Sequence, residues 1–286
     1  MEIRAENLSH TFNAGTPLET RALENVSFTL PSGRALGILG GTGSGKTTLI
    51  KHFNGLLAPT QGRIFLDGKD LGSYGGSLGN TVGVVFQRPE RQLFEETVAA
   101  DVSFVLRRFS GLSEDDILNK VRACCTMLGL NIDEIADRSP LALSDGQKRK
   151  VAIAGILVND PRVLVLDEPA VGLDPESVTD LVHVLDRIKR EKRRSIVVVS
   201  HDMEPFLGLL DFLLVLRKGC VAAYGSPDDV CSMLGDDPMM SEYLPDLAMV
   251  VYRLQRQGMA LRPEGYEIES IVEQLAAIAA SEEKTS

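Results

Sequence analysis

"GGTGSGKT", residues 40–47, is the stretch of this sequence that decides the fold. It fits the pattern G-x-x-x-x-G-K-[ST], with a short apolar run at 35–39 before it and a helical stretch from Lys46 to about Phe53 after it. Glycines let backbone N–H groups curl around phosphate oxygens, and the start of a helix adds a positive dipole. A glycine turn that binds nothing is the alternative, but both flanks favour a phosphate-binding loop.

The residues of this loop predict separate tasks on a bound nucleotide. Lys46 is expected to bridge the β- and γ-phosphates, and Thr47 is expected to place its hydroxyl on Mg²⁺. The predicted nucleotide site comprises the loop and the residue after it, namely Gly40, Gly41, Thr42, Gly43, Ser44, Gly45, Lys46, Thr47 and Thr48.

A second motif, VLVLDEP at 163–169, ends a buried strand with two acids. Asp167 stands at the strand end, where a carboxylate can hold Mg²⁺ directly or through water. Strand alternation points the neighbouring Glu168 elsewhere, toward the place of a hydrolytic water. Two solvated acids capping a strand are the alternative, but a strand-final Asp-Glu-Pro together with the glycine loop favours a catalytic site.

The rest of the chain divides into three parts. Short apolar runs predict strands at 3–12, 22–30, 35–39, 62–66, 82–86, 163–166, 196–199 and 212–216, which indicates an α/β fold with a parallel sheet covered on both faces. Residues of about 89–160 show only helical periodicity, with helices expected at 97–109, 114–128 and 145–158. Residues 236–286 form a C-terminal extension with helical patterns at 240–257 and 268–280.

Composition narrows the classes of partner. The 286 residues carry a net charge of −10, of which residues 236–286 supply −6 from ten acids and four bases, so nucleic acid is not expected as a partner. Two short basic runs, 148–150 and 189–194, are interpreted as solvated helix faces. The longest apolar stretch, 206–216, is far too short to span a membrane, so any work at a membrane is expected to go through partners.

Further motifs give the chain a family resemblance. LSDGQ at 143–147 precedes a helix, Gln87 follows a strand, GLD stands at 172–174, and His201 follows the strand at 196–199. With the glycine loop and the Asp-Glu pair, the chain resembles the ATP-binding subunit of an ABC transporter over residues 1–235. The implied fold is a P-loop NTPase cassette with a RecA-like core, an antiparallel β subdomain and an inserted helical subdomain at about 89–160.

The resemblance implies ATP as substrate, Mg²⁺ as cofactor, and a role for each matching residue. Phe12 would stack on adenine, and Gln87 would contact Mg²⁺ or water and report the γ-phosphate to the membrane partner. His201 would hydrogen-bond the γ-phosphate and hold the water that Glu168 activates. Two subunits sandwich two nucleotides in this family, so four residues would serve the opposite subunit: Ser144, Gly146, Gln147 and Asp174.

Asp145 is a departure from the family, which usually has glycine there. A carboxylate about 8 Å from a phosphate charge, at an effective dielectric near 20, costs roughly 2 kcal/mol, a factor of about 30 in affinity. Asp also suits the first turn of a helix, and it could face outward toward Lys148 or Arg149. Both interpretations stay open: a tolerated, outward-facing cap, or the mark of the weaker of two unequal sites.

The stretches 85–104 and 139–157 resemble ATPases of energy-coupling factor (ECF) transporters for cobalt and vitamin uptake, and 15–23 and 42–57 resemble the second of their two ATPase paralogues. The implied partners are a second ATPase subunit, contacted in part through residues 236–286, a transmembrane T component and a substrate-binding S component. The chain would be peripheral, on the cytoplasmic face of the membrane, and power micronutrient import. Four acids are expected to give the T-component groove negative charge: Glu90, Glu95, Glu96 and Asp101.

Two other classes remain as alternatives. A soluble ABC ATPase acting on ribosomes or DNA usually carries two cassettes or a long coiled coil, and this chain shows neither. A P-loop kinase outside the ABC family lacks the 143–147 motif and a counterpart of His201.

Overall fold

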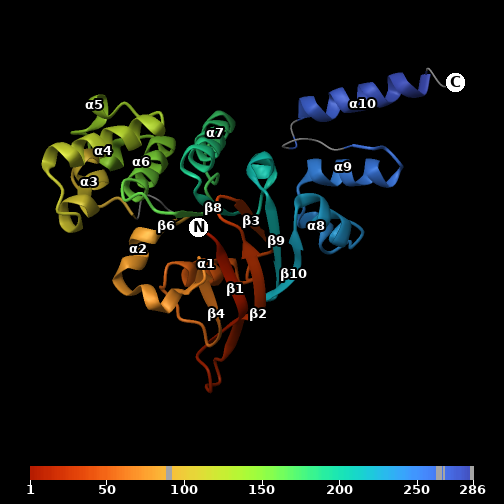
Figure 1. The fold of residues 1–286 in the computed structure, drawn as a ribbon, viewed down its shortest axis with the longest axis horizontal. Coiled ribbons are helices and arrows are strands. Elements are labelled where there is room, and N and C mark those ends of the chain that lie inside the picture. The colour runs from red at the N-terminus through yellow and green to blue at the C-terminus, as the bar shows by residue number, and fades with distance from the viewer. Residues whose placement is uncertain (88–91, 262–265, 267, 284–286) are drawn as a thin grey trace.

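The computed structural model describes residues 1–87, 92–261, 266 and 268–283. A six-stranded sheet with the order β10-β9-β3-β8-β7-β6 runs through the centre of the molecule (Figure 1). Five of its strands are parallel, and β10 pairs antiparallel with β9. The strand bounds are β3 Ala35–Leu39, β6 Val82–Val85, β7 Val163–Asp167, β8 Ser195–Val199, β9 Phe212–Arg217 and β10 Cys220–Gly225.

The central strands are apolar throughout because both faces of this sheet are covered. Every residue of β3, β7 and β8 is buried. In β3, Ala35 and Leu39 join one core cluster while Leu36 and Ile38 join the other, as the alternation of side chains in a strand requires. The continuous apolar runs in the sequence therefore predicted these strands correctly, whereas β10, half exposed, was missed.

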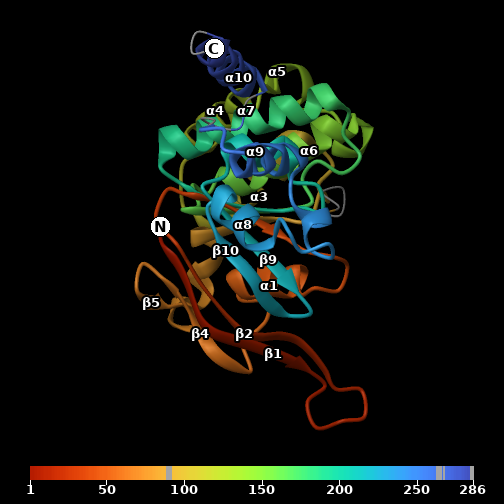
Figure 2. The ribbon, with the colours of Figure 1, turned by 90° about the vertical axis from the view of Figure 1, so that its right-hand side faces the viewer.

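A second, antiparallel sheet has the order β2-β1-β4-β5. Its strands are β1 Ile3–Phe12, β2 Thr20–Leu30, β4 Gln61–Leu66 and β5 Lys69–Asp70. Figure 2 shows the β1–β2 hairpin projecting well beyond the body of the molecule. Helix α1 (Lys46–Phe53) buries Leu49, Ile50 and Phe53 in the core cluster that joins the two sheets.

Further helical segments complete this part, and the longest of them, α7, contributes to the core cluster on the other face of the central sheet. They are η1 Leu71–Ser77, α2 Leu78–Thr81, α7 Pro175–Lys192 and η4 Glu204–Leu209. Leu181, Leu185 and Ile188 of α7 lie in the same core cluster as Leu164 and Leu166 of β7.

The segment between β6 and β7 is helical and forms a lobe of its own beside the sheet (Figure 1). Its helices are α3 Val98–Phe109, α4 Glu114–Met127, α5 Ile132–Ile135, η3 Pro140–Ala142 and α6 Asp145–Leu157. Thr97, Ser113 and Ser144 cap α3, α4 and α6 by accepting a backbone N–H, which fixes where each helix begins. Between residues 92 and 162, where the chain is described throughout, there is no strand.

Helix α8 (Pro227–Leu234) precedes the C-terminal extension, whose helices are η5 Ser241–Tyr243, α9 Asp246–Arg256 and α10 Ile268–Glu283. The prediction of a helix over 240–257 was wrong at its start, because η5 ends at Tyr243 and Pro245 stands at the N-cap of α9. Tyr243 reaches the glycine loop: a β-carbon on Gly41 would lie 3.0 Å from its phenol oxygen. In the described part of the chain, no helix has both the length and the hydropathy to cross a membrane.

The interpretation of the two basic runs as solvated helix faces was wrong at three residues. Arg149 is 7 % exposed, and Arg194 is buried against Asp160. Lys189 forms an ion pair of 2.6 Å with Asp211. Each cation meets acceptors that lie far away in the sequence, so the charge pattern along a helix could not reveal them.

Candidate active site

The carboxyl ends of four adjacent strands carry the predicted catalytic residues. The glycine loop follows β3, His201 follows β8, Asp167 ends β7 with Glu168 directly after it, and Gln87 follows β6. Because the sheet order is β3-β8-β7-β6 and these strands are parallel, all of these residues lie in a row along one edge. This edge is where open α/β sheets bind their ligands.

The glycine loop adopts a conformation that only glycine tolerates. Gly40, Gly43 and Gly45 have φ of 144°, 76° and 107°. A β-carbon would lie 2.3 Å from the Leu216 carbonyl oxygen at Gly40 and 2.6 Å from the Ala22 carbonyl oxygen at Gly45. The backbone is therefore packed closely against its surroundings at both positions, so neither could accept a side chain.

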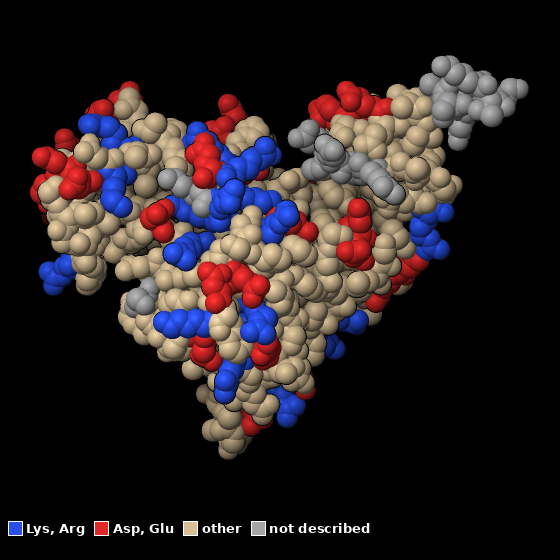
Figure 3. Space-filling model, in the orientation of Figure 1, with Lys and Arg blue, Asp and Glu red and all other residues tan. Residues whose placement is uncertain are grey.

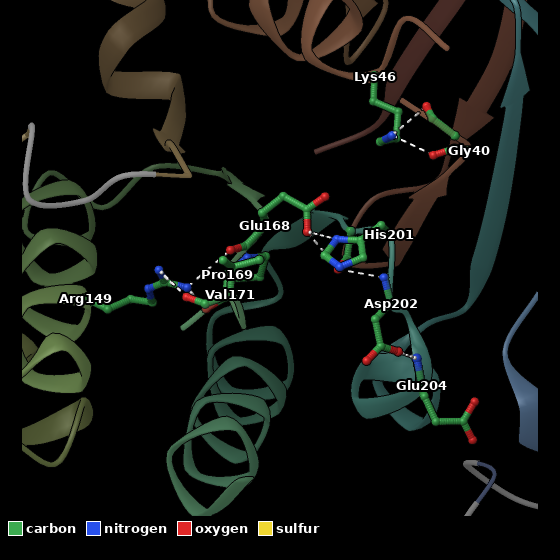
Figure 4. Close-up of polar contacts among 11 residues, drawn as sticks. Gly40, Lys46, Arg149, Glu168, Pro169, Val171, His201, Asp202 and Glu204 are labelled. Carbon is green, nitrogen blue, oxygen red and sulfur yellow. Dashed lines mark hydrogen bonds and ion pairs between the residues drawn. The ribbon is translucent and has the colours of Figure 1, made fainter. Parts of the chain in front are cut away.

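Lys46 lies inside this loop and donates to the carbonyl oxygens of Gly40 at 2.6 Å and Gly41 at 3.1 Å (Figure 4). Burial lowers the pKa of the Lys46 ammonium, and the charges of Glu168 and Asp167 oppose that shift. An ammonium group half removed from water, next to a concave loop, is suited to a phosphate.

The loop also contains a polar atom that a ligand would satisfy. The Ser44 hydroxyl is buried and has no hydrogen-bond partner among the described residues, which is costly in a folded protein. Thr47, the first residue of α1 after Lys46, is exposed, and Thr48 is half-buried. The residues present therefore fit a nucleotide phosphate with its cation.

Asp167 is 8 % exposed at the end of β7. Burial and the neighbouring Glu168 raise the pKa of the Asp167 carboxyl to about 6, against the opposing charges of Lys46 and Lys51. No group of three or more His, Cys, Asp or Glu side chains that could hold a metal occurs among residues 1–87, 92–261, 266 and 268–283. A Mg²⁺ ion here would depend on Asp167 together with phosphate oxygens, the arrangement this cation prefers.

Glu168 is held by two residues that follow β8. Its Oε2 accepts from the Ser200 hydroxyl at 3.1 Å and lies 2.8 Å from His201 Nδ1 (Figure 4). The Glu168 backbone is left-handed, with φ of 51°, which redirects its side chain away from that of Asp167. The two acids thus have different neighbours, and Ser200 is a partner that the sequence did not single out.

Gln87 and Phe12 stand at the borders of the site. Gln87 is exposed in the bend after β6. Phe12 is 37 % exposed at the end of β1 and packs edge-on against His10, with ring centroids 4.5 Å apart. His10 in turn lies 3.2 Å from the buried His52 of α1, so the predicted adenine platform is connected to the helix of the glycine loop.

Residues 143–147 span the start of helix α6, which begins at Asp145 with Ser144 as its N-cap. Ser144 and Gln147 form a capping box: the Ser144 hydroxyl accepts from the Gln147 N–H, and the Ser144 N–H donates to the Gln147 side chain, both at 3.2 Å. Gly146 lies against the start of α7, since a β-carbon there would lie 3.4 Å from the Ser177 hydroxyl.

Asp145 faces outward in the single chain, as the cap interpretation expects. Its side chain is 80 % exposed and forms an ion pair of 3.1 Å with Lys148. Asp174 directly precedes α7 and caps it by accepting from the Ser177 N–H at 2.9 Å, and hydrogen bonds from Ser177 lower the pKa of its carboxyl.

The predicted acidic groove for a membrane partner is wrong at Asp101. This carboxylate is buried and accepts from the backbone N–H groups of Phe94 and Glu95, so it stabilises a loop instead of facing a partner. Glu95 is half-buried and Glu96 is exposed, while Glu90 lies outside the described residues.

The family model for the ABC transporter matches residues 23–171. The energy-coupling factor transporter ATP-binding protein EcfA2 of Clostridium acetobutylicum is 38 % identical over 94 % of this chain and 95 % of its own length. The protein of the same name from Acetivibrio thermocellus is 43 % identical over 79 % of this chain and 80 % of its own.

The chain belongs to the energy-coupling factor group of ABC transporter ATP-binding proteins. Solved structures agree with this assignment. The protein cbiO1 from Clostridium perfringens, described as part of the ABC transporter complex cbiONQ, is 34 % identical with a TM-score of 0.74 over 90 % of this chain and 96 % of that one.

An ATP-binding cassette solved as a dimer in a post-hydrolysis state with ADP and Pi is 26 % identical, with a TM-score of 0.70 over 78 % of this chain and 98 % of that one. The predicted family, the predicted fold and the predicted class of enzyme, an ATPase, are thereby confirmed. The alternative of a soluble ABC ATPase with a target other than a transporter is not supported.

Proposed function

We propose that this ECF-group ATPase binds and hydrolyses ATP at the row of strand ends and thereby powers import of a micronutrient, such as a vitamin or a cobalt or nickel ion. The single observation that carries the proposal is the geometry of this row. The cationic loop around Lys46 and the Glu168–His201 pair lie at one sheet edge, on β3, β7 and β8.

The glycine loop performs the binding. Its backbone N–H groups and the start of α1 face the phosphates, and Lys46 exchanges its two carbonyl partners for oxygens of the β- and γ-phosphates. Thr47, Gln87 and Asp167 would hold Mg²⁺, which, when bound, neutralises charge on the phosphate oxygens. Asp167 does so in its ionised form, and the charge of a nearby cation favours that form.

Glu168 acts on the attacking water. His201 Nδ1 lies within hydrogen-bond distance of Glu168 Oε2, at 2.8 Å. When His201 turns to a γ-phosphate oxygen instead, a water can take its place beside Oε2 and give up a proton to the carboxylate, while the Ser200 hydroxyl still donates to Oε2 and orients the group. The water oxygen bonds to the γ-phosphorus, the bond to the ADP oxygen breaks, and the proton resides on Glu168.

A second subunit would complete each site. Ser144, Gly146 and Gln147 begin a helix whose N-terminus can receive the γ-phosphate of a partner's ATP, and Asp174 would bridge the two subunits. The dimeric neighbour bound to ADP and Pi supports this arrangement.

Residues 236–286 would extend the contact between subunits. Helix α10 exposes Ile268 and Val272, at 63 % and 57 %, and Figure 3 shows acidic side chains beside neutral surface where this helix lies. We propose that residues 1–235 form the cassette and that this extension contributes to dimerisation.

The transporter itself would dock near Gln87 and the helical lobe at about 89–160. The relatives named for ECF transporters and the neighbour from the cbiONQ complex support a place in a membrane complex, with a T component and an S component as partners. The chain would be peripheral, on the cytoplasmic face. Two of the proposed groove acids remain candidates for steering a basic helix, Glu95 and Glu96.

The test uses the chain assembled with its companion subunits in vesicles. Lys46→Ala should remove ATP binding, and Glu168→Gln should keep binding but reduce hydrolysis at least about 100-fold. Uptake of radiolabelled candidates, cobalt, nickel and individual vitamins, is measured in parallel. Undiminished uptake by either variant would show that the proposed site does not drive transport.

A further inference from the structure

Arg149 is a buried cation that the nucleotide chemistry above does not use. It lies on α6, is 7 % exposed, and points its guanidinium at the turn that follows β7 (Figure 4). This guanidinium donates to the carbonyl oxygens of Glu168 at 3.2 Å and Val171 at 3.1 Å, and to that of Pro169. We call residues 168–171 the catalytic turn.

These three contacts require an arginine. The guanidinium is planar and carries five N–H groups in a fixed fork, so one side chain can serve three carbonyl oxygens at once. A lysine would bring one compact ammonium group with strong hydration, and it could not match the same spacing. Charge-assisted bonds to carbonyl oxygens also compensate for removing the cation from water.

The catalytic turn needs such support because Glu168 is conformationally strained. A residue with a side chain at φ of 51° is less stable than in the usual regions and persists only when its surroundings hold it. The Glu168 N–H donates to Val199 of β8 at 2.7 Å, and its carbonyl oxygen accepts from Arg149. Both backbone groups of the proposed general base are thus fixed, one by the sheet and one by α6.

The same helix begins at the loop that serves the opposite subunit. Ser144 caps α6 only five residues before Arg149, and Gly146 packs against Leu173 and Ser177 just beyond the catalytic turn. The start of α6 and the segment 168–177 therefore contact each other at two separate places. A displacement of the helix start would move the carbonyl oxygen of Glu168 with it.

We propose that Arg149 is a positioning residue that fixes the backbone of Glu168 and couples it to the loop at 143–147. The proposal rests on the proposed function, because it assigns Glu168 the role of general base. It predicts that Arg149 controls the rate of hydrolysis and leaves nucleotide binding nearly untouched, since its hydrogen bonds to Glu168, Pro169 and Val171 all lie in the catalytic turn.

The experiment compares Arg149→Lys and Arg149→Gln in the assembled complex with a matched control. Lys150→Gln serves as the control, because Lys150 is the next residue and pairs with the exposed Asp180 on α7. Single-turnover ATP hydrolysis gives the chemical rate, and titration with a non-hydrolysable ATP analogue gives the affinity. We expect the rate to fall about 10-fold for the lysine variant and about 100-fold for the glutamine variant. Affinity should stay within about 2-fold, and the control should change neither quantity by more than about 2-fold.

A second readout separates positioning from general structural support. In a Glu168→Gln background, Arg149→Lys should lower the residual hydrolysis rate by less than about 2-fold, because the group it positions is already absent. A further drop of about 10-fold there, or a loss of affinity that matches the loss of rate, would overturn the proposal. An unchanged rate in the lysine variant would do the same, and this variant decides the question if the glutamine variant does not fold.

The proposed function and this inference fail in different ways. If Glu168→Gln alone keeps full hydrolysis, the proposed function is wrong and the inference falls with it. If Glu168→Gln abolishes hydrolysis while Arg149→Lys keeps the full rate and affinity, only the role of Arg149 is wrong.

Discussion

Replacing Asp167 by asparagine should stabilise the protein without nucleotide even though it removes a proposed cation ligand. The carboxyl is buried beside Glu168, and this environment raises its pKa from the ordinary 3.8 to about 6. An acid with a raised pKa stabilises the fold below its ordinary pKa, and this contribution is lost as the pH rises through about 6. At pH 7.5 the ionised Asp167 therefore destabilises the nucleotide-free fold.

The size of this effect follows from the same shift. The difference between 3.8 and about 6 corresponds to about 3 kcal/mol at pH 7.5 and to about half of that at pH 5. For 286 residues the entropy of unfolding is about 0.6 kcal/mol/K, so Asp167→Asn should raise Tm by about 5 °C at pH 7.5. The gain should shrink by about half at pH 5.

The assay is thermal unfolding of the purified chain without nucleotide, followed by circular dichroism at pH 5 and at pH 7.5. Asp180→Asn is the control, because that carboxylate is 58 % exposed on α7 and should change Tm little. Added MgATP should stabilise the original chain far more than the Asp167→Asn variant. A variant no more stable than the original at pH 7.5, or equally stabilised at both pH values, would refute the reasoning.

Three further predictions address the same site. Asp145→Gly should change ATPase activity of the complex by less than about 2-fold, because the carboxylate pairs with Lys148 at the surface; a rise of about 30-fold would favour the inhibitory interpretation instead. Gly45→Ala should abolish binding of an ATP analogue and lower Tm, because the added β-carbon would lie 2.6 Å from the Ala22 carbonyl oxygen. Normal affinity in a calorimetric titration would contradict this. The affinity for Mg²⁺ in the presence of an ATP analogue should be about 2-fold lower at pH 6, and about 10-fold lower at pH 5, than with Asp167 fully ionised, because the carboxyl takes up a proton. An affinity that does not depend on pH would exclude Asp167 as a ligand.

The parts that the sequence predicted correctly are those whose chemistry is local. Strands buried on both faces are continuous apolar runs, and Ala35–Leu39 and Ser195–Val199 could be recognised as such. The motifs come together at one edge because parallel strands carry their carboxyl ends there and each motif stands just after a strand, whereas the roles of the individual residues stay predictions. For Asp145 the sequence offered an outward-facing cap as one of two interpretations, because a first-turn acid suits the helix dipole and a lysine stands three residues on, and the ion pair with Lys148 agrees with that one.

The parts that were missed depend on contacts between distant segments. Arg149 reads as one of three surface cations along a helix, and only the fold brings it to the catalytic turn about 20 residues later. In the sequence, Asp101 is one acid among several, and only the fold shows that its carboxylate accepts from the backbone N–H groups of residues 94 and 95. The start of α9 was misplaced because apolar periodicity continues across Pro245, where the backbone cannot.

The contact between Tyr243 and the glycine loop makes the loop depend on the C-terminal extension. The phenol lies where any side chain at position 41 would grow, and a cavity of about 350 Å³ is lined both by the loop and by residues of the segment 238–243. Cutting the chain at residue 235 would expose the outer side of the nucleotide cradle to solvent and deprive it of its backing. A shortened cassette is therefore a different catalyst from the intact chain, and rates measured on one should not be transferred to the other.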